Sequence, residues 1–269
     1  MIEFTDCDVI INGTGLVADS ASISERNSIK PAYGVGRFGV LMLPDGPKTS
    51  DIQINYTLNP LKETNLRIIN DLKSNPPIIN PINIEIAGLR CSGYITSFSM
   101  SLSPNEKISA SVSYISYHDT IGQVSKKRGT VFYDVNPVNA GHSWSSIVSS
   151  GSGNFSKTYN LSYECSFDYQ PFYSFGNTSP NQILFIGGQE SARVIKEDFN
   201  RINFSGQSGA HQLFSSSGES VFLYNLNKEI DSDIPSLNID LRSAIVTNSR
   251  LSARLDDYIQ AEISLEREF

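Results

Sequence analysis

The chain has 269 residues, of which 39% are hydrophobic and only 18% are charged, against roughly 25% charged residues in an average domain. Serine, asparagine, threonine and glycine replace the missing charges, and their preference for turns and sheet surfaces disfavours a helical bundle. The formal net charge of −7 is unlike that of proteins whose main task is to grip nucleic acid, because such proteins present a basic face to the phosphates.

The cysteine pattern and the N-terminal residues narrow the class further. Cys7, Cys91 and Cys165 are far apart and odd in number, which disfavours a disulfide scaffold and a CxxC metal site. We expect them to be buried thiols. Because the N-terminus lacks a basic segment and no run of about 18 apolar residues occurs, we expect no signal peptide, no membrane span and synthesis in a reducing cytoplasm.

Alternation with a period of two dominates the chain and predicts half-buried strands. The strands expected first along the chain are Asp8–Ile11, Arg37–Leu43, Asp51–Leu58 and Ile82–Ala87. One segment between them has helical spacing, at Leu61, Thr64, Ile68 and Leu72. We expect Asn59 to cap this helix, Pro60 to occupy its first turn and Pro76-Pro77 to end it.

The clearest hairpin signal lies between residues 99 and 114. Ser99–Ser103 and Ile108–Tyr114 each alternate serine with apolar residues, and Pro104–Lys107 is a polar turn between them. This pattern predicts a β-hairpin with one apolar face and one serine face.

An internal repeat organises the chain. Two matches share an offset of 151 residues, a third has an offset of 155, and a fourth, upstream, has an offset of 140. The matched segments are Ile95–Met100 with Val246–Leu251, Ile108–Ser113 with Ile259–Ser264, Ile82–Ile86 with Leu237–Leu241, and Pro31–Gly36 with Pro171–Gly176. The predicted fold is therefore mainly β, with two tandem β-sandwich or barrel domains over 1–118 and 159–269, each with at most one short flanking helix.

A connector over 119–158 separates the two predicted copies. Its second half is rich in serine and glycine, as in a flexible segment or an extended arm. Its first half contains Lys126, Lys127 and Arg128, which fit either a solvated loop or hairpin, or a contact with an acidic neighbour such as another copy of the chain. The second predicted copy, with 8 basic and 15 acidic residues, is the acidic part of the molecule.

Motifs that would indicate an enzyme are weak. Gly34, Gly36 and Gly39 form a GxGxxG pattern, but a strand is expected after it, whereas a dinucleotide site needs a helix there. Asp231 and Asp233 begin like a calcium loop but lack its glycine and final glutamate. Asp256-Asp257 falls in the turn of the second hairpin. We predict no catalytic residue, no cofactor and no metal ion.

The histidines leave one enzymatic alternative open. His118, His142 and His211 lie in no HExxH pattern, and no GxSxG motif accompanies them. A hydrolase that uses one of them is a minor alternative, and alanine replacement of all three would abolish turnover without affecting assembly.

The segment Gly93–Tyr114, with its strand–turn–strand pattern, and the Pro-x-Tyr-x-x-Gly turn at Pro31–Gly36 resemble the tail tube family of contractile and long-tailed phages. The resemblance implies tube-fold domains, six to a ring, in rings that stack around a DNA channel. A chain with two such domains would form a trimer with pseudo-sixfold symmetry. It implies location in the virion tail, sheath, baseplate or tape-measure proteins as partners, passage of genomic DNA without specific binding, and no membrane contact.

Within this hypothesis the hairpins divide into a core side and a channel side. Unpaired sheet edges would be closed by joining neighbours into one barrel. The residues expected in the core are Ile108, Ala110, Val112, Ile259, Ala261 and Ile263. The residues expected to face the channel are Ser99, Ser101, Ser109, Ser111, Ser113, Gln260, Glu262, Ser264 and Glu266. Serine and glutamate would let DNA slide, although Arg250 and Arg254 fall near the same face.

Two alternatives remain open beside the repeating tube subunit. One is a single-ring baseplate hub, adaptor or tail terminator of the same fold, which copy number per particle would distinguish. The other is a carbohydrate-binding β-sandwich, which usually exposes aromatic side chains on one strand face and would bind glycans in isolation.

Overall fold

The computed structural model is mainly β, as the sequence predicts, and contains one helix in its described part. The described residues are 1–26, 29–33, 40–44, 47–58, 64–103, 106, 108–124, 144–149, 158–175, 177, 179–197, 219–225, 237–241, 245–252 and 260–269.

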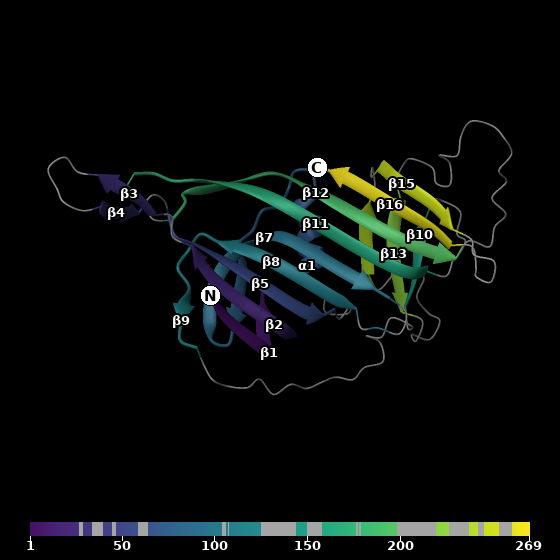
Figure 1. Cartoon of the computed structure of the whole chain (residues 1–269), viewed down its shortest axis with the longest axis horizontal. Helices are drawn as coiled ribbons and strands as arrows, with labels where there is room; N and C mark the ends of the chain where they lie inside the picture. The colour runs from purple at the N-terminus through teal and green to yellow at the C-terminus, as the bar shows by residue number, and fades with distance from the viewer. Residues whose placement is uncertain are drawn as a thin grey trace.

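Six antiparallel strands of the N-terminal half close into a barrel (Figure 1). The barrel order is β7-β6-β1-β2-β5-β8, and the pairing of β7 with β8 closes it. These strands are β1 (Ile2–Ile11), β2 (Thr14–Arg26), β5 (Thr49–Thr57), β6 (Ile82–Ile86), β7 (Leu89–Leu102) and β8 (Ser109–Ser116). The predicted hairpin at residues 99–114 is confirmed as β7 and β8.

The turn between β1 and β2 follows directly from its two residues. Ile11 pairs with Thr14, so that only Asn12 and Gly13 form the loop, with φ angles of 47° and 81°. Two positive φ angles define a type I′ turn, whose twist matches that of the flanking strands, and Asn-Gly is the preferred pair for it.

Four more strands extend the sheet from β7 into the C-terminal half. Leu89–Gly93 of β7 pairs with β6, and Ser97–Leu102 on the same edge pairs with β11 (Thr158–Phe172). Beyond β11 the sheet continues through β12 (Gln182–Glu197), β16 (Gln260–Glu268) and β15 (Ile245–Ser252).

The remaining strands lie outside this run. β3 (Ile29–Tyr33) pairs with β4 (Val40–Pro44), and β9 (Ile121–Gly122) pairs with β7. β10 (Trp144–Ser149), β13 (Glu219–Asn225) and β14 (Leu237–Leu241) form a separate three-stranded sheet.

The predicted helix is present as α1 (Asn65–Leu72), behind the sheet in the view of Figure 1. Leu66, Ile69 and Leu72 are buried in the core. The helix begins at Asn65 with Thr64 as its N-cap, so the prediction that Asn59 caps it and Pro60 lies in its first turn was wrong; both of these residues lie outside the described ones. The helix ends at Leu72, four residues before Pro76.

Hydrogen bonds from the barrel strands hold the first residue of this helix. The Asn65 amide donates to the Tyr56 hydroxyl at 2.8 Å, and the Tyr114 hydroxyl donates to the Asn65 carbonyl oxygen. Because all three side chains are buried, these bonds satisfy polar groups that would otherwise be costly to bury.

The registers of the hairpins repeat along the chain. Between Ile95 and Ser97 the pairing of β7 with β8 shifts, and between Val246 and Asn248 that of β15 with β16 shifts in the same way, 151 residues later. Every residue pair of β15–β16 is a β7–β8 pair with 151 added to both numbers.

Two further pairings, β2–β5 and β5–β8, repeat in the same way, with an offset of 140 for residues of β2 and β5 and of 151 for residues of β8. The β2–β5 register shifts between Ala18 and Ser20, and the β11–β12 register shifts between Thr158 and Asn160. The pairs of β5–β8 recur in β12–β16 with 140 and 151 added. The run β2-β5-β8-β7, here the N-terminal quartet, therefore has the strand order and register of the run β11-β12-β16-β15, the C-terminal quartet.

The match at an offset of 155 falls on strands with different partners. β6 pairs with β1 and β7, whereas β14 pairs with β13 in the described residues. The domain limits 1–118 and 159–269 stay a prediction.

Candidate functional site

Alternating side chains give the two quartets one continuous polar face. On β7 and β8, Phe98, Met100 and Val112 are buried, so their serine neighbours lie on the opposite side of the sheet. The register sets these serines directly across from each other, as the pairs Ser97–Ser113, Ser99–Ser111 and Ser101–Ser109.

The polar face continues without a break onto the C-terminal quartet. Leu161, Tyr163 and Cys165 of β11 are buried, and the residues between them pair with the serines of β7. The β11 members of the face are Ser162, Glu164 and Ser166, opposite Ser101, Ser99 and Ser97. The next strands add the pairs Gln189–Glu268, Ser191–Glu266 and Arg193–Ser264.

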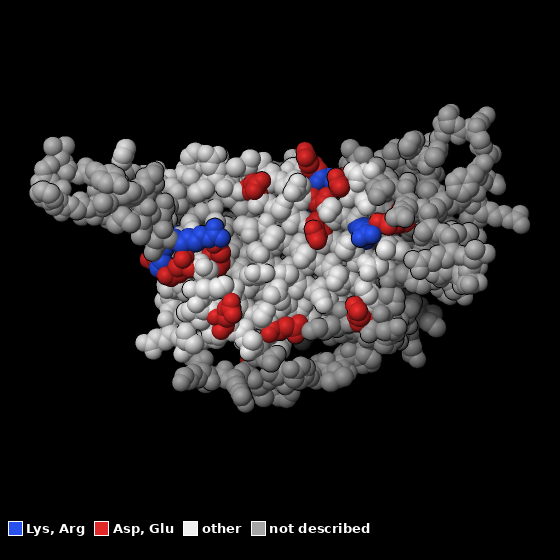
Figure 2. Space-filling model, viewed as in Figure 1, with Lys and Arg blue, Asp and Glu red and all other residues white. Residues whose placement is uncertain are grey.

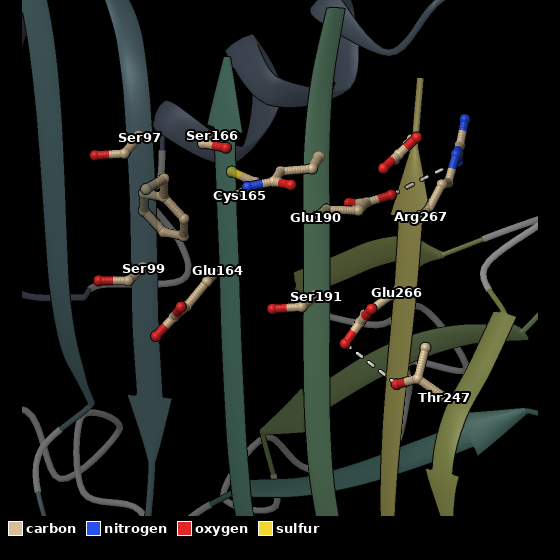
Figure 3. Close-up of a pocket in the computed structure, with 13 residues that line it drawn as sticks. Ser97, Ser99, Glu164, Cys165, Ser166, Glu190, Ser191, Thr247, Glu266 and Arg267 are labelled. Carbon is tan, nitrogen blue, oxygen red and sulfur yellow. Dashed lines mark hydrogen bonds and ion pairs between the residues drawn. The ribbon is translucent and has the colours of Figure 1, made fainter. Parts of the chain in front are cut away.

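Two hollows lie side by side on this face. The larger, about 930 Å³, lies over β7, β11, β12 and β16, and its labelled side chains are mostly serines and carboxylates (Figure 3). The smaller, about 370 Å³, extends across β8 and shares Ser99 and Glu164 with the first. The aromatic residues that line them, Phe98 and Tyr56, are themselves buried, so these hollows offer no exposed aromatic surface.

Carboxylates dominate the charge of this face (Figure 2). Arg193 Nε lies 2.7 Å from Glu262 Oε1, and the Thr247 hydroxyl donates to Glu266 at 3.2 Å. Within the described residues, Glu164 and Glu268 have no basic partner. A surface of this kind disfavours close approach of phosphate groups.

The predicted channel-facing residues lie on this one face wherever their side chains are described. These are Ser99, Ser101, Ser109, Ser111, Ser113, Glu262, Ser264 and Glu266, none of which is buried. The backbone of Gln260 belongs to β16, but its side chain is outside the description. The face takes in part of each half of the chain.

The expected core side is confirmed for the first hairpin. Ile108, Ala110 and Val112 are buried, whereas the side chains of Ile259, Ala261 and Ile263 lie outside the described residues. So do Arg254 and the basic run Lys126, Lys127 and Arg128. Arg250 is paired in register with Glu262 on β16.

The sequence interpretation missed the contribution of β11 and β12, which supply the middle of the face. The signal was present in Leu161–Phe167, where apolar residues alternate with Ser162, Glu164 and Ser166. No local pattern indicates that this strand pairs with β7, because that contact joins residues about 65 positions apart.

A buried ionic cluster lies beneath the polar face and links the two halves. Lys73, just after α1, forms an ion pair with Glu190 of β12, and their side chains are only 6% and 0% exposed. The Lys73 ammonium donates to the Tyr163 hydroxyl at 3.0 Å and lies 5.4 Å from the centre of that ring. Arg267 Nη1 lies 3.7 Å from the second oxygen of Glu190.

Burial fixes the protonation of the groups beside this cluster. It raises the pKa of Tyr163 well above the usual value, with further contributions from Cys165 and Glu190. The phenol therefore keeps its proton, and the Tyr163 hydroxyl donates a hydrogen bond of 2.8 Å to Glu190. Burial also raises the pKa of Cys165 to about 12, so this thiol is a poor nucleophile at neutral pH.

The weaker enzymatic candidates gain no assembled site. His118 is exposed and lines a separate hollow that includes Cys91, whose pKa burial raises to about 11. Within the described residues, no three histidine, cysteine or acidic side chains are grouped to hold a metal ion. The other candidates lie outside the described residues, namely Gly34, Gly36, Gly39, His142, His211, Asp231, Asp233, Asp256 and Asp257.

In comparisons with known proteins, neither a protein-family model nor a curated protein matches this chain. In the part of the chain that the structure describes, no helix is long and apolar enough to cross a bilayer.

Proposed function

We propose that this chain is a structural protein of a phage tail, located in the virion, where it forms stacked rings around a channel that conducts DNA. Three copies would supply six quartets and give a ring with pseudo-sixfold symmetry. The observation that carries the proposal is the edge-to-edge joining of two quartets of identical register into one sheet with a continuous polar face.

The chemistry of that face supports passage of DNA over binding of DNA. Affinity for the DNA backbone comes from lysine and arginine that replace counterions on the phosphates. The described hollows are lined mostly by serines and by carboxylates such as Glu164 and Glu266, and the arginine among their lining residues, Arg267, lies 3.7 Å from the Glu190 carboxylate. DNA inside such a wall would be repelled weakly at every position and held at none, as a conduit requires.

The assembly partners follow from the same proposal. The polar face would line the channel, and the assembled rings would meet sheath, baseplate or tape-measure proteins. No step of this function needs a catalytic residue, a cofactor or a membrane.

Electron microscopy of the purified protein, and of particles that contain it, tests the proposal. We expect rings or tubes with a central pore. Compact monomers at high concentration, with no ring, tube or partner, would contradict it. Many rings per particle would identify the tube subunit, whereas one ring would identify a hub, adaptor or terminator of the same fold.

A further inference from the structure

Both strands of the joint between the two quartets belong to the same chain, and their register is known. Ser97–Leu102 of β7 pairs with Leu161–Ser166 of β11 in antiparallel register. β7, at the end of the N-terminal quartet β2-β5-β8-β7, is thereby hydrogen-bonded to β11, at the start of the C-terminal quartet β11-β12-β16-β15.

The repeat assigns an equivalent to each strand of this joint. Position 99 of β7 corresponds to position 250 of β15, at an offset of 151, and position 164 of β11 corresponds to position 24 of β2, at an offset of 140. β15 and β2 are the two outermost strands of the run of eight.

Both equivalent edges have free backbone groups in the described part of the chain. β15 pairs there only with β16. β2 pairs with β1 up to Ile23, and from Ser24 to Arg26 it pairs only with β5. Unpaired edges of this kind are templates for pairing with another strand.

We propose that β15 of one copy pairs antiparallel with β2 of a second copy, with Arg250 opposite Ser24, Ser249 opposite Glu25 and Asn248 opposite Arg26. This inference deepens the proposed ring assembly and rests on it. The register is that of the internal joint, with each residue replaced by its equivalent in the repeat. The contact is head-to-tail, because its two edges differ, so it can close into a ring.

The N-terminus sets the length of this joint. Ile2 and Glu3 occupy the β2 edge at Ile23 and Ser22. The joint therefore covers the three pairs above while β1 stays in place. Continuation to Leu251 and Ser252, which the internal joint predicts, requires these first residues to detach.

Disulfide trapping with full-length chains tests the register. Directly opposed residues of antiparallel strands have Cα atoms about 4.5–5.5 Å apart, within the range that a disulfide spans. The variants are Ser24→Cys and Arg250→Cys, each with a circular dichroism spectrum to verify folding. The three native cysteines are buried, and burial raises the pKa of Cys91 to about 11 and of Cys165 to about 12, so their background reaction at pH 8 is slow.

We expect a mixture of the two single variants to give a covalent dimer that neither variant forms alone. The chain carrying both substitutions should give a ladder of covalent oligomers on a non-reducing gel. Ser99→Cys with Glu164→Cys is the positive control, because the internal joint sets these residues opposite each other. Ser20→Cys with Arg250→Cys, four residues off register, should give no bridge.

Three results would overturn the inference. The first is a covalent homodimer of one single variant, because it would indicate a two-fold contact. The second is a disulfide within one chain of the double variant, and the third is no disulfide between the mixed variants while the positive control forms its own. Micrographs of the same samples separate this from the proposed function. Rings without the bridge refute the register and leave ring assembly standing, whereas the bridge without rings or tubes supports the pairing and contradicts the tail role.

Discussion

The two quartets have the same hydrogen-bond plan but different support beneath it. The N-terminal quartet is closed into a barrel by β1 and β6, whereas no such closure joins β11 to β15 in the described residues. Position 190 of β12 holds a buried glutamate, and the equivalent position 50 of β5 holds a buried serine. Tyr163, which contacts that glutamate, corresponds to Ile23. The comparison shows that backbone register was kept while the buried chemistry at the junction diverged.

The largest expected effect comes from breaking the ionic cluster. Glu190→Gln leaves the Lys73 ammonium buried without its carboxylate, and loss of one partner of a buried pair costs about 3–5 kcal/mol of unfolding free energy. Ser50→Ala, at the equivalent position, should change it by less than about 1 kcal/mol, because the Ser50 hydroxyl has no hydrogen-bond partner among the described residues. Chemical denaturation measures both.

Equal losses in the two variants would contradict the idea that this position is specialised. If Glu190→Gln does not fold, the double variant Lys73→Met with Glu190→Gln provides the test, since neutralising both partners should recover much of the stability.

The second effect is a fall in stability at alkaline pH. In the unfolded chain the thiols lose their protons near pH 9, whereas burial raises the pKa of Cys91 to about 11 and that of Cys165 to about 12. Between these limits the folded state binds more protons, so stability falls as pH rises, by about 1.4 kcal/mol per pH unit for each thiol. Thermal melts from pH 7 to 11 measure it.

The variants Cys91→Ala and Cys165→Ala distinguish the contribution of the thiol in the N-terminal quartet from that of the thiol in the C-terminal quartet. Each should flatten the slope between pH 9 and 11, the range over which both buried thiols keep their protons in the folded state. A slope that neither variant changes would show that other groups cause the loss.

The third effect concerns the two-residue turn between β1 and β2. Gly13→Ala places a side chain at φ +81°, although the space around it is open, and should cost about 1–2 kcal/mol of unfolding free energy. Gly15→Ala, two residues away in similar open space and without a positive φ, is the matched control and should cost less. A larger loss for Gly15→Ala would count against the type I′ turn.

The smallest effect on stability is expected on the polar face. Ser101→Lys with Ser113→Lys replaces one exposed and one half-buried serine of this face. The pair should change the unfolding free energy by less than about 0.5 kcal/mol for each site, yet raise retention of double-stranded DNA at low salt. Ser101→Thr with Ser113→Thr is the uncharged control. Retention of DNA by the unsubstituted protein equal to that of the lysine variant would contradict a non-binding channel wall.

Much of the local structure was predictable from the sequence. The alternation around Ser99–Ser103 identified the hairpin and its serine face, and the spacing of Ile68 and Leu72 identified the helix. The Asn12-Gly13 turn and the strand β2 after it were not predicted, although Asn-Gly is a hairpin signal, and β1 begins six residues before the predicted Asp8–Ile11. Local signals of this kind depend on side-chain periodicity and turn geometry, which neighbouring residues determine.

The order of residues is enough to predict the strand periodicity, the excess of acidic residues and the offsets of 140 and 151 that recur in the registers. Long-range packing of the chain sets two other features: one edge of β7 pairs with both β6 and β11, and Lys73 forms an ion pair with Glu190 beneath the joint. Strand partners far apart in the chain are chosen by burial of the whole sheet and by backbone hydrogen bonds, which are the same for every residue type. No short stretch of sequence could specify them.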